Sequence, residues 1–395
     1  GNDIFRFLSG WGADIVNELA SGGADTINFS SLSVALTFAF GVAGVTVSNG
    51  ANTLTINSTD VENFIGGSSD DQFTFNDGAS ISGSIDSAGG SDTLDYSPYT
   101  SARTITLTAN GGVDGFAGSA SGVGGTFDNI NIIVGGAGSD TLNGPDNGGA
   151  WNFGAATTFT SGGQTLIYSA IETLSAGSGA DEFVIENGTT FAGTLDGRGG
   201  TDTLDLSAFT TARNVVLTSV GTTDGFNGTE ASVTAFANID ILIGTSSTDS
   251  LTGAALNATY ELDGTNRYYF GTNTIDLNSF ETLVGGSAND TFKFGDGYTF
   301  NGSLNGGAGN DTLDLSAFIT KRIVTLTAAS ATDGFDGVTA SVSGGFININ
   351  NLIGSSTITV DQLTGPDFDT NWQIGATNSI TVGANSATFS SFEHL

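Results

Sequence analysis

The sequence predicts an all-β fold, namely a β-solenoid (β-helix) with about 22 residues in each coil. Three observations support this prediction. A unit of about 110 residues recurs along the chain, and a shorter step of about 21 residues recurs inside each unit. Glycine occurs 60 times whereas proline occurs only 3 times. So many glycines with so few prolines indicate an ordered chain with many tight turns.

A short acidic segment marks the long repeat. Ser91-Asp92-Thr93-Leu94-Asp95 returns as Thr201-Asp202-Thr203-Leu204-Asp205 and as Asn310-Asp311-Thr312-Leu313-Asp314, at nearly equal intervals. These intervals divide the chain into a shortened repeat at 1–64 and whole repeats at 65–174, 175–283 and 284–395.

The short step favours a solenoid. Asp71, Asp92 and Asp114 follow one another at nearly equal steps, and aspartates recur at similar steps in the next two repeats. If Asp25 is aligned with Asp92, the shortened repeat lacks the equivalent of two coils. A solenoid tolerates such a loss because each coil contacts only its neighbours, whereas a closed sandwich would lose essential strands. Tandem β-sandwich domains of about 110 residues are the alternative fold.

Residues between the turns alternate in polarity, as half-buried strands do. Thr104-Ile105-Thr106-Leu107-Thr108 and Phe73-Thr74-Phe75 are examples. We expect many of the 28 phenylalanines, which occupy equivalent positions, to stack in the interior. Roughly 18 such coils at about 4.8 Å spacing would form a rod on the order of 85 Å long.

The composition restricts the partners. With 41 acidic and 8 basic residues, the formal net charge is -33, which disfavours nucleic acid and anionic membranes as partners. No apolar run reaches about 18 residues, so no membrane span is expected. The absence of cysteine suits an exposed, oxidising setting. The absence of methionine indicates a processed form or a piece of a longer chain.

Two segments fit the pattern G-G-x-G-x-D-x-U-x, in which U is a large apolar residue: Gly306 to Asp314 and Gly135 to Asn143. At these residues the chain resembles the hemolysin-type, or RTX, calcium-binding repeats of large bacterial surface (adhesin-like) proteins. The segment Phe236 to Gly244 is similar to a lead-in found in such proteins. The resemblance implies calcium as the cofactor, with these metal ligands: Asp71, Asp92, Asp140, Asp181, Asp202, Asp290 and Asp311.

The chain departs from the RTX pattern in its spacing. RTX nonapeptides follow one another directly, whereas most copies here stand farther apart, as Asp71 and Asp92 do. In some copies Arg198 or Ser69 replaces a motif glycine. Glutamates stand nine residues before three of the aspartates and would partly restore paired sites: Glu62, Glu172 and Glu281.

The alternative interpretation is that each aspartate caps a tight turn by accepting hydrogen bonds from backbone amides. Stacked carboxylates about 5 Å apart repel by roughly 3 kcal/mol per pair at an effective dielectric near 20, and this repulsion favours a cation.

Catalytic residues are not evident, so we expect no enzyme. The single histidine, His394, lies near the end of the chain, and no serine stands in a nucleophile-elbow context. One arginine stands eleven residues after the first aspartate of each acidic segment that marks the long repeat. We expect a structural role for all three: Arg103, Arg213 and Arg322.

These features predict a secreted or cell-surface structural protein, a calcium-stabilised shaft or filament of a fibre, adhesin or matrix. Gly1-Asn2-Asp3 matches Ala288-Asn289-Asp290, so we expect the chain to join copies of itself head to tail or to form part of a longer array. The alternative is a carbohydrate-binding or polysaccharide-cleaving β-helix with surface carbohydrate as its partner. Several exposed aromatic side chains in a cleft with Arg or Lys would favour it.

Overall fold

The structure is a computed structural model that describes residues 1–18, 22–357 and 360–395. All regular elements in these ranges are strands, and most neighbouring coils pair in parallel, as in a β-solenoid. The predicted fold class is therefore confirmed. Parallel pairing of this kind does not suit tandem β-sandwiches, whose sheets are antiparallel. No helix in the described ranges is long and apolar enough to cross a membrane.

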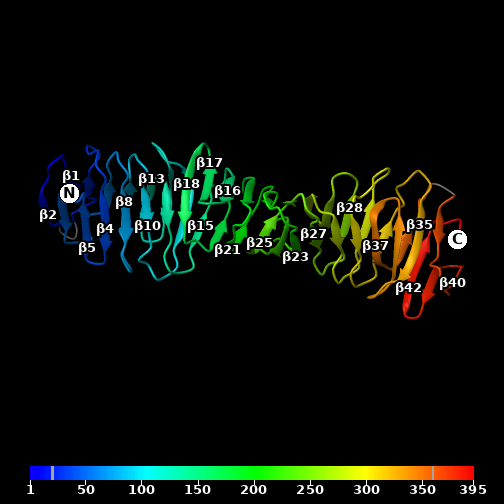
Figure 1. The fold of residues 1–395 in the computed structure, drawn as a ribbon. Coiled ribbons are helices and arrows are strands. Elements are labelled where there is room, and N and C mark those ends of the chain that lie inside the picture. Colours follow the sequence, from blue (N-terminus) through cyan, green and yellow to red (C-terminus); the bar gives the residue numbers. More distant parts are fainter. Residues whose placement is uncertain (19–21, 358–359) are drawn as a thin grey trace. The chain divides into compact units, whose positions relative to one another are not determined.

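The described residues form two compact units: unit 1 is Gly1–Val184 with Phe191–Gly200, and unit 2 is Ile185–Thr190 with Thr201–Leu395. In each unit the chain passes alternately through two sheets, which we call A and B, and successive coils lie side by side (Figure 1). The repeat boundaries at 65, 175 and 284 derive from the sequence alone and stay a prediction.

The strands of unit 1 are short. Sheet A contains β1 (Ile4–Arg6), β3 (Thr26–Asn28), β7 (Asn63–Ile65), β9 (Ile85–Asp86), β11 (Thr104–Asn110), β12 (Phe116–Ala120), β13 (Phe127–Ile130), β15 (Thr141–Asn143), β19 (Thr173–Ser175) and β21 (Phe191–Asp196). Sheet B contains β2 (Ala13–Val16), β4 (Thr37–Gly41), β5 (Gly44–Ser48), β6 (Thr53–Ile56), β8 (Gln72–Phe75), β10 (Thr93–Asp95), β14 (Ile132–Val134), β16 (Gly149–Phe153), β17 (Thr157–Ser161), β18 (Gln164–Ser169) and β20 (Asp181–Ile185).

Unit 2 has the same alternation. Its sheet A contains β23 (Asn214–Val220), β24 (Phe226–Glu230), β25 (Val233–Ile239), β27 (Ser250–Thr252), β31 (Thr282–Val284), β33 (Ser303–Asn305), β35 (Ile323–Ala329), β36 (Phe335–Thr339), β37 (Val342–Ile349) and β39 (Gln362–Thr364). Its sheet B contains β22 (Thr203–Asp205), β26 (Ile241–Ile243), β28 (Thr259–Leu262), β29 (Arg267–Phe270), β30 (Asn273–Asn278), β32 (Thr291–Phe294), β34 (Thr312–Asp314), β38 (Asn351–Ile353), β40 (Asn371–Gln373), β41 (Asn378–Val382) and β42 (Asn385–Ser390).

A plain coil is short and carries one strand of each sheet. Phe73 of β8 pairs with Leu94 of β10 on sheet B, and Leu174 of β19 pairs with Leu195 of β21 on sheet A. All four side chains are buried. The register is therefore set by apolar side chains that must stay on the inner face, since a shift by one residue would turn them to solvent.

Antiparallel insertions make other coils longer. In sheet A, β12 runs antiparallel between β11 and β13, so the chain that leaves Leu94 of β10 returns to sheet B only at Ile133 of β14. In sheet B, β17 runs antiparallel between β16 and β18. The expectation that every coil has the same length is therefore wrong. The step from Asp92 to Asp114 is not a coil, because Asp114 lies in the turn between β11 and β12.

Residues 1–64 have the strand order of the second half of a repeat. The antiparallel strands β4, β5 and β6 form an insertion in sheet B, and β4 pairs in parallel with β8 as β28 does with β32. Asp25 precedes a sheet A strand, whereas Asp92 precedes a sheet B strand. Aligning these two aspartates is therefore wrong, and no loss of two coils is needed to explain the shorter segment.

Aromatic side chains stack between coils, as expected. The ring centroids of Phe38 and Phe73 are 4.5 Å apart, and those of Phe40 and Phe75 are 4.4 Å apart. In unit 2 the rings of Tyr260 and Phe292 are 4.9 Å apart and nearly parallel. These pairs add about 0.5–1.5 kcal/mol each to the stabilisation that comes from burial.

We expect Phe292→Ala to lower the free energy of unfolding by about 3–5 kcal/mol, because it removes a fully buried ring from the stack. The matched control is Phe270→Ala, which truncates a ring that is 39 % exposed, and which should cost less than about 1 kcal/mol. Urea denaturation followed by circular dichroism measures both. Equal losses for the two variants would contradict the interior stack.

Candidate functional site

Buried aspartates stand at both turns of the coil. All seven predicted metal ligands are at most 2 % exposed. Asp140 directly precedes a strand of sheet A, and the other six stand directly before, or at the first residue of, strands of sheet B: Asp71, Asp92, Asp181, Asp202, Asp290 and Asp311. The structure therefore distributes these residues along the coils and does not gather them into one site.

Along sheet B the carboxylates form a series of bonds between coils, which we call ladder B. In unit 1 the backbone N–H of Leu36 donates to Asp71 Oδ1 (2.8 Å), and the N–H of Asp71 donates to Asp92 Oδ1 (2.7 Å). The N–H of Asp92 then donates to Asn131 Oδ1 (3.0 Å). Each side-chain oxygen replaces a backbone carbonyl at the turn, where strand pairing stops.

Unit 2 has the same ladder B. The N–H of Ala258 donates to Asp290 Oδ1 (3.0 Å), the N–H of Asp290 to Asp311 Oδ1 (2.8 Å), and the N–H of Asp311 to Asn350 Oδ1 (3.1 Å). Asparagine can therefore stand in for aspartate in this series.

A second series, ladder A, runs along sheet A. The N–H of Arg103 donates to Asp140 Oδ1 (2.6 Å), and the N–H of Asp140 donates to Glu172 Oε2 (2.7 Å). The same bonds recur in unit 2 in two sets of three residues: Arg213, Asp249 and Glu281, and Arg322, Asp361 and Glu393. Glu172 and Glu281 thus belong to ladder A, whereas the aspartates with which we paired them, Asp181 and Asp290, belong to sheet B turns. Glu62 likewise accepts the N–H of Asp25 (2.7 Å).

The second carboxylate oxygen explains the glycine of the motif. Asp140 Oδ2 accepts the N–H of Gly136, and Asp71 Oδ2 accepts the N–H of Gly67 (2.6 Å). A Cβ atom on Gly135 would lie 2.7 Å from Asp140 Oδ2, and one on Gly306 would lie 2.5 Å from Asp311 Oδ2. At Gly135 and Gly306 the folded carboxylate itself therefore requires glycine five residues before the aspartate, whether or not a metal is bound. Other copies differ, since Ser87 stands at this position before Asp92 and Ala176 before Asp181.

The ladder aspartates differ in how well they fit calcium, which takes six to eight oxygen ligands. Both oxygens of Asp71 and of Asp140 accept backbone N–H groups, so the capping interpretation accounts for these two residues. In contrast, Oδ2 of Asp92, Asp290 and Asp311 is buried and has no hydrogen-bond partner among the described residues. These three keep one oxygen that suits a hard cation.

Burial makes the ladder B carboxyls weak acids. Burial raises the pKa of Asp290 to about 8, and the neighbouring charge of Asp311 adds to the shift. Burial likewise raises the pKa of Asp311 to about 7, with a further rise from Asp333. Burial raises the pKa of Asp92 to about 7 and those of Asp71 and Asp181 to about 6. These carboxyls are partly protonated near neutral pH unless a cation offsets their charge.

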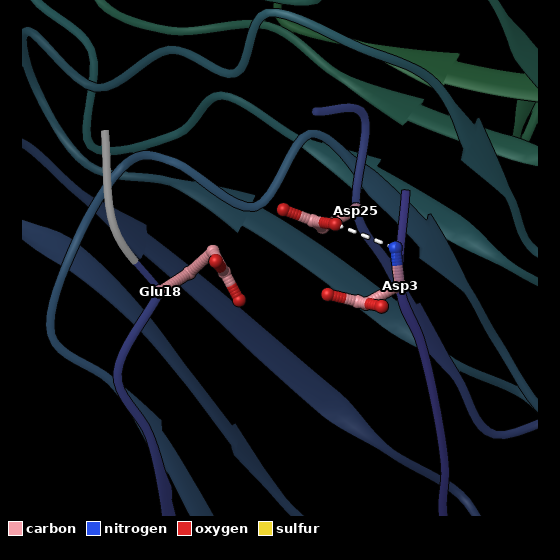
Figure 2. Close-up of side chains that lie close together, drawn as sticks. All are labelled: Asp3, Glu18 and Asp25. Carbon is pink, nitrogen blue, oxygen red and sulfur yellow. Dashed lines mark hydrogen bonds between the residues drawn. The ribbon is translucent and has the colours of Figure 1, made fainter. Parts of the chain in front are cut away.

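Acidic side chains gather in two places among the described residues. In unit 2, oxygens of Asp202, Asp224 and Asp240 all lie within 4.8 Å of one another. In unit 1 the same holds for Asp3, Glu18 and Asp25, where Asp25 Oδ1 accepts the N–H of Asp3 (2.7 Å) (Figure 2).

Sequence reasoning assigned only Asp202 of these six residues to a metal site. Asp224 follows Asp202 as Asp114 follows Asp92, but that spacing was interpreted only as the step of a coil.

The three repeated arginines have a structural role in this geometry. The guanidinium of Arg103 lies 4.1 Å from the ring centre of Tyr99, and Arg213 and Arg322 stack similarly on Phe209 and Phe318. Arg213 also pairs with the buried Glu230. The arginine side chains therefore pack on aromatic rings, while their backbone N–H groups enter ladder A.

The fold and the two ladders define the chain as a β-solenoid repeat protein. No model of a known protein family matches the chain, and no curated protein matches it significantly.

We expect Asp140→Ala to destabilise the protein by about 2–5 kcal/mol, because the N–H groups of Arg103 and Gly136 lose their acceptor. Asp140→Asn keeps one acceptor oxygen and should cost less. Urea denaturation in calcium and in chelator measures both variants. The loss should be the same in the two conditions. A loss confined to the calcium sample would show that Asp140 acts as a metal ligand.

The raised pKa values predict that stability falls as pH rises. The folded chain holds protons on ladder B carboxyls that the unfolded chain releases near pH 4, so stability present at low pH is lost as pH passes through about 6 to 8. In chelator, the melting temperature should fall on the order of 5–10 °C between pH 5 and pH 8.5. Asp290→Asn should reduce this fall. A melting temperature that rises over the same interval would refute the prediction.

Proposed function

We propose that this protein is a structural β-solenoid segment that serves as a shaft or filament in an extracellular fibre, adhesin or matrix, with calcium reinforcing part of its turns. The observation that carries the proposal is the pair of carboxylate ladders. They recur between Asp3 and Glu393 and bond turns of both units to the next coil. Such bonds hold coils together without forming a pocket, which suits a structural element.

The distribution of the acidic residues supports a structural role over an enzymatic one. A polysaccharide-cleaving β-helix gathers its acids and a base on one face of a few coils. Here equivalent acids recur at both turns in unit 1 and in unit 2. Their hydrogen bonds go to backbone N–H groups of the chain itself.

The grooves give the carbohydrate alternative little support. A groove of about 870 Å³ in unit 1 is lined by Arg198 with threonine and asparagine side chains, and its lining includes no aromatic residue. A second groove of about 450 Å³ contains Trp11 but no basic residue. Neither groove combines several aromatic side chains with a basic one, which is the arrangement that sugar binding favours.

Secretion and self-association belong to the same proposal. A net charge of -33 and the absence of cysteine suit an exposed protein that lives among cations and oxidants. Edge strands of a sheet carry unpaired backbone groups, and head-to-tail contact between copies would pair them.

Negative-stain electron microscopy tests the proposed shaft. Purified protein in calcium should show rods or filaments, and chelator should loosen them and lower the melting temperature. A sample in magnesium alone controls for a general effect of divalent charge. Separate globular beads in calcium would overturn the shaft, whereas rods that ignore chelation would remove only the role of calcium.

A further inference from the structure

Each whole repeat places the turn of an inserted hairpin over a turn of the coil. In unit 2, Asp333 lies between β35 and β36, and its Oδ2 accepts the N–H of Gly309, two residues before Asp311 (3.3 Å). In unit 1, Asp114 Oδ2 accepts the N–H of Gly90 in the same way (3.4 Å). The hairpin aspartate and the ladder B aspartate of the coil turn are thereby held close together.

The two flanking repeats leave a pair of buried oxygens at this contact. Oδ2 of Asp311 and Oδ1 of Asp333 are both buried and without a hydrogen-bond partner among the described residues. Oδ2 of Asp92 and Oδ1 of Asp114 are buried in the same manner. Asp311 and Asp92 are 0 % exposed, so water does not reach their side chains. A buried carboxylate oxygen needs a partner, and a cation bound at this contact would supply one to both carboxylates.

The middle repeat carries a third carboxylate at this place. Asp202, Asp224 and Asp240 come from three segments of unit 2, and their oxygens lie within 4.8 Å of one another. Asp240 occupies the position of Asn131 and Asn350, because its Oδ2 accepts the N–H of Asp202 (3.0 Å) as those asparagines accept the N–H of Asp92 and Asp311. The middle cluster thus offers three carboxylates where each flanking one offers two carboxylates and an amide.

The side-chain oxygens at these contacts indicate which kind of ion would bind there. The side-chain atoms that could bind a metal ion at these contacts are oxygens of carboxylates and amides. Calcium is the hard divalent cation that binds such oxygens in irregular geometry. The affinity of a calcium site rises with the number of carboxylates, provided that the turn does not move.

We propose that each whole repeat binds one calcium ion between its ladder B aspartate and its hairpin-turn aspartate, and that the middle site, which includes Asp240, binds most tightly. The pairs are Asp92 with Asp114, Asp202 with Asp224, and Asp311 with Asp333. The ion fastens the inserted hairpin onto the coil. The inference rests on the proposed calcium-stabilised function, but it assigns new ligands to it, since Asp114, Asp224, Asp240 and Asp333 lie outside the glycine-rich nonapeptide pattern.

Isothermal titration of the metal-free, full-length chain with calcium chloride, up to about 10 mM, tests the proposal. We expect one tighter site and two weaker ones. Asp240→Asn copies the flanking arrangement and should weaken the tight site by about tenfold or more, to the level of the other two. Asp224→Asn removes the hairpin carboxylate and should weaken the tight site at least as much, whereas Asp333→Asn should remove one weak site and leave the tight one. Glu182→Gln, at an exposed position, is the control and should change nothing.

Circular dichroism checks that each variant is folded, and Asn131 and Asn350 show that the fold accepts asparagine at the position of Asp240. Absence of calcium binding would overturn the proposal and would mean that a shared proton neutralises each carboxylate pair. Binding that none of the aspartate variants alters would also overturn it. Calcium binding as expected, together with globular beads in the microscope, would retain these sites and refute the shaft.

Discussion

The hydrogen bond from a turn N–H to a buried carboxylate of the next coil is the interaction on which the rest of the structure depends. Strand pairing bonds the coils along their faces, but at each turn the backbone bends away and its N–H groups need other acceptors. Aspartate supplies one at both turns, as Asp140 and Asp290 show. Bonds of this kind are charge-assisted and stronger than those between neutral groups.

This arrangement has an electrostatic cost that links the fold to its surroundings. The carboxylates lie in the interior, away from water, and repel one another. Burial raises the pKa of Asp290 to about 8, and repulsion from the neighbouring Asp311 adds to the rise. A proton or a cation relieves the repulsion. Where both oxygens bond to backbone N–H groups, as in Asp71, the protein relieves much of it alone. Where one oxygen lacks a partner, as in Asp311, the fold depends on what the solution supplies.

The sequence predicts the fold class and the position of the aspartates at turns, because glycine turns, alternating strands and regular acids are direct marks of coil geometry. It does not predict that these aspartates are buried. It predicts the coil length poorly. Both turns use the same chemistry, so Asp25-Thr26-Ile27 of sheet A and Asp92-Thr93-Leu94 of sheet B look alike in the sequence. The spacing of Asp114 resembles a coil step although a hairpin insertion produces it. Which glutamate meets which aspartate depends on the sheet that follows, and the spacing alone does not record that.

Amide hydrogen exchange at the ladder residues tests the central claim most directly. The N–H groups of Asp71, Asp140, Asp249 and Asp290 lie at turns, yet each donates to a carboxylate of the next coil. We expect them to exchange as slowly as the amides of the neighbouring strands. Exchange as fast as that of ordinary exposed turns would contradict the ladders and, with them, the account of how the coils are held together.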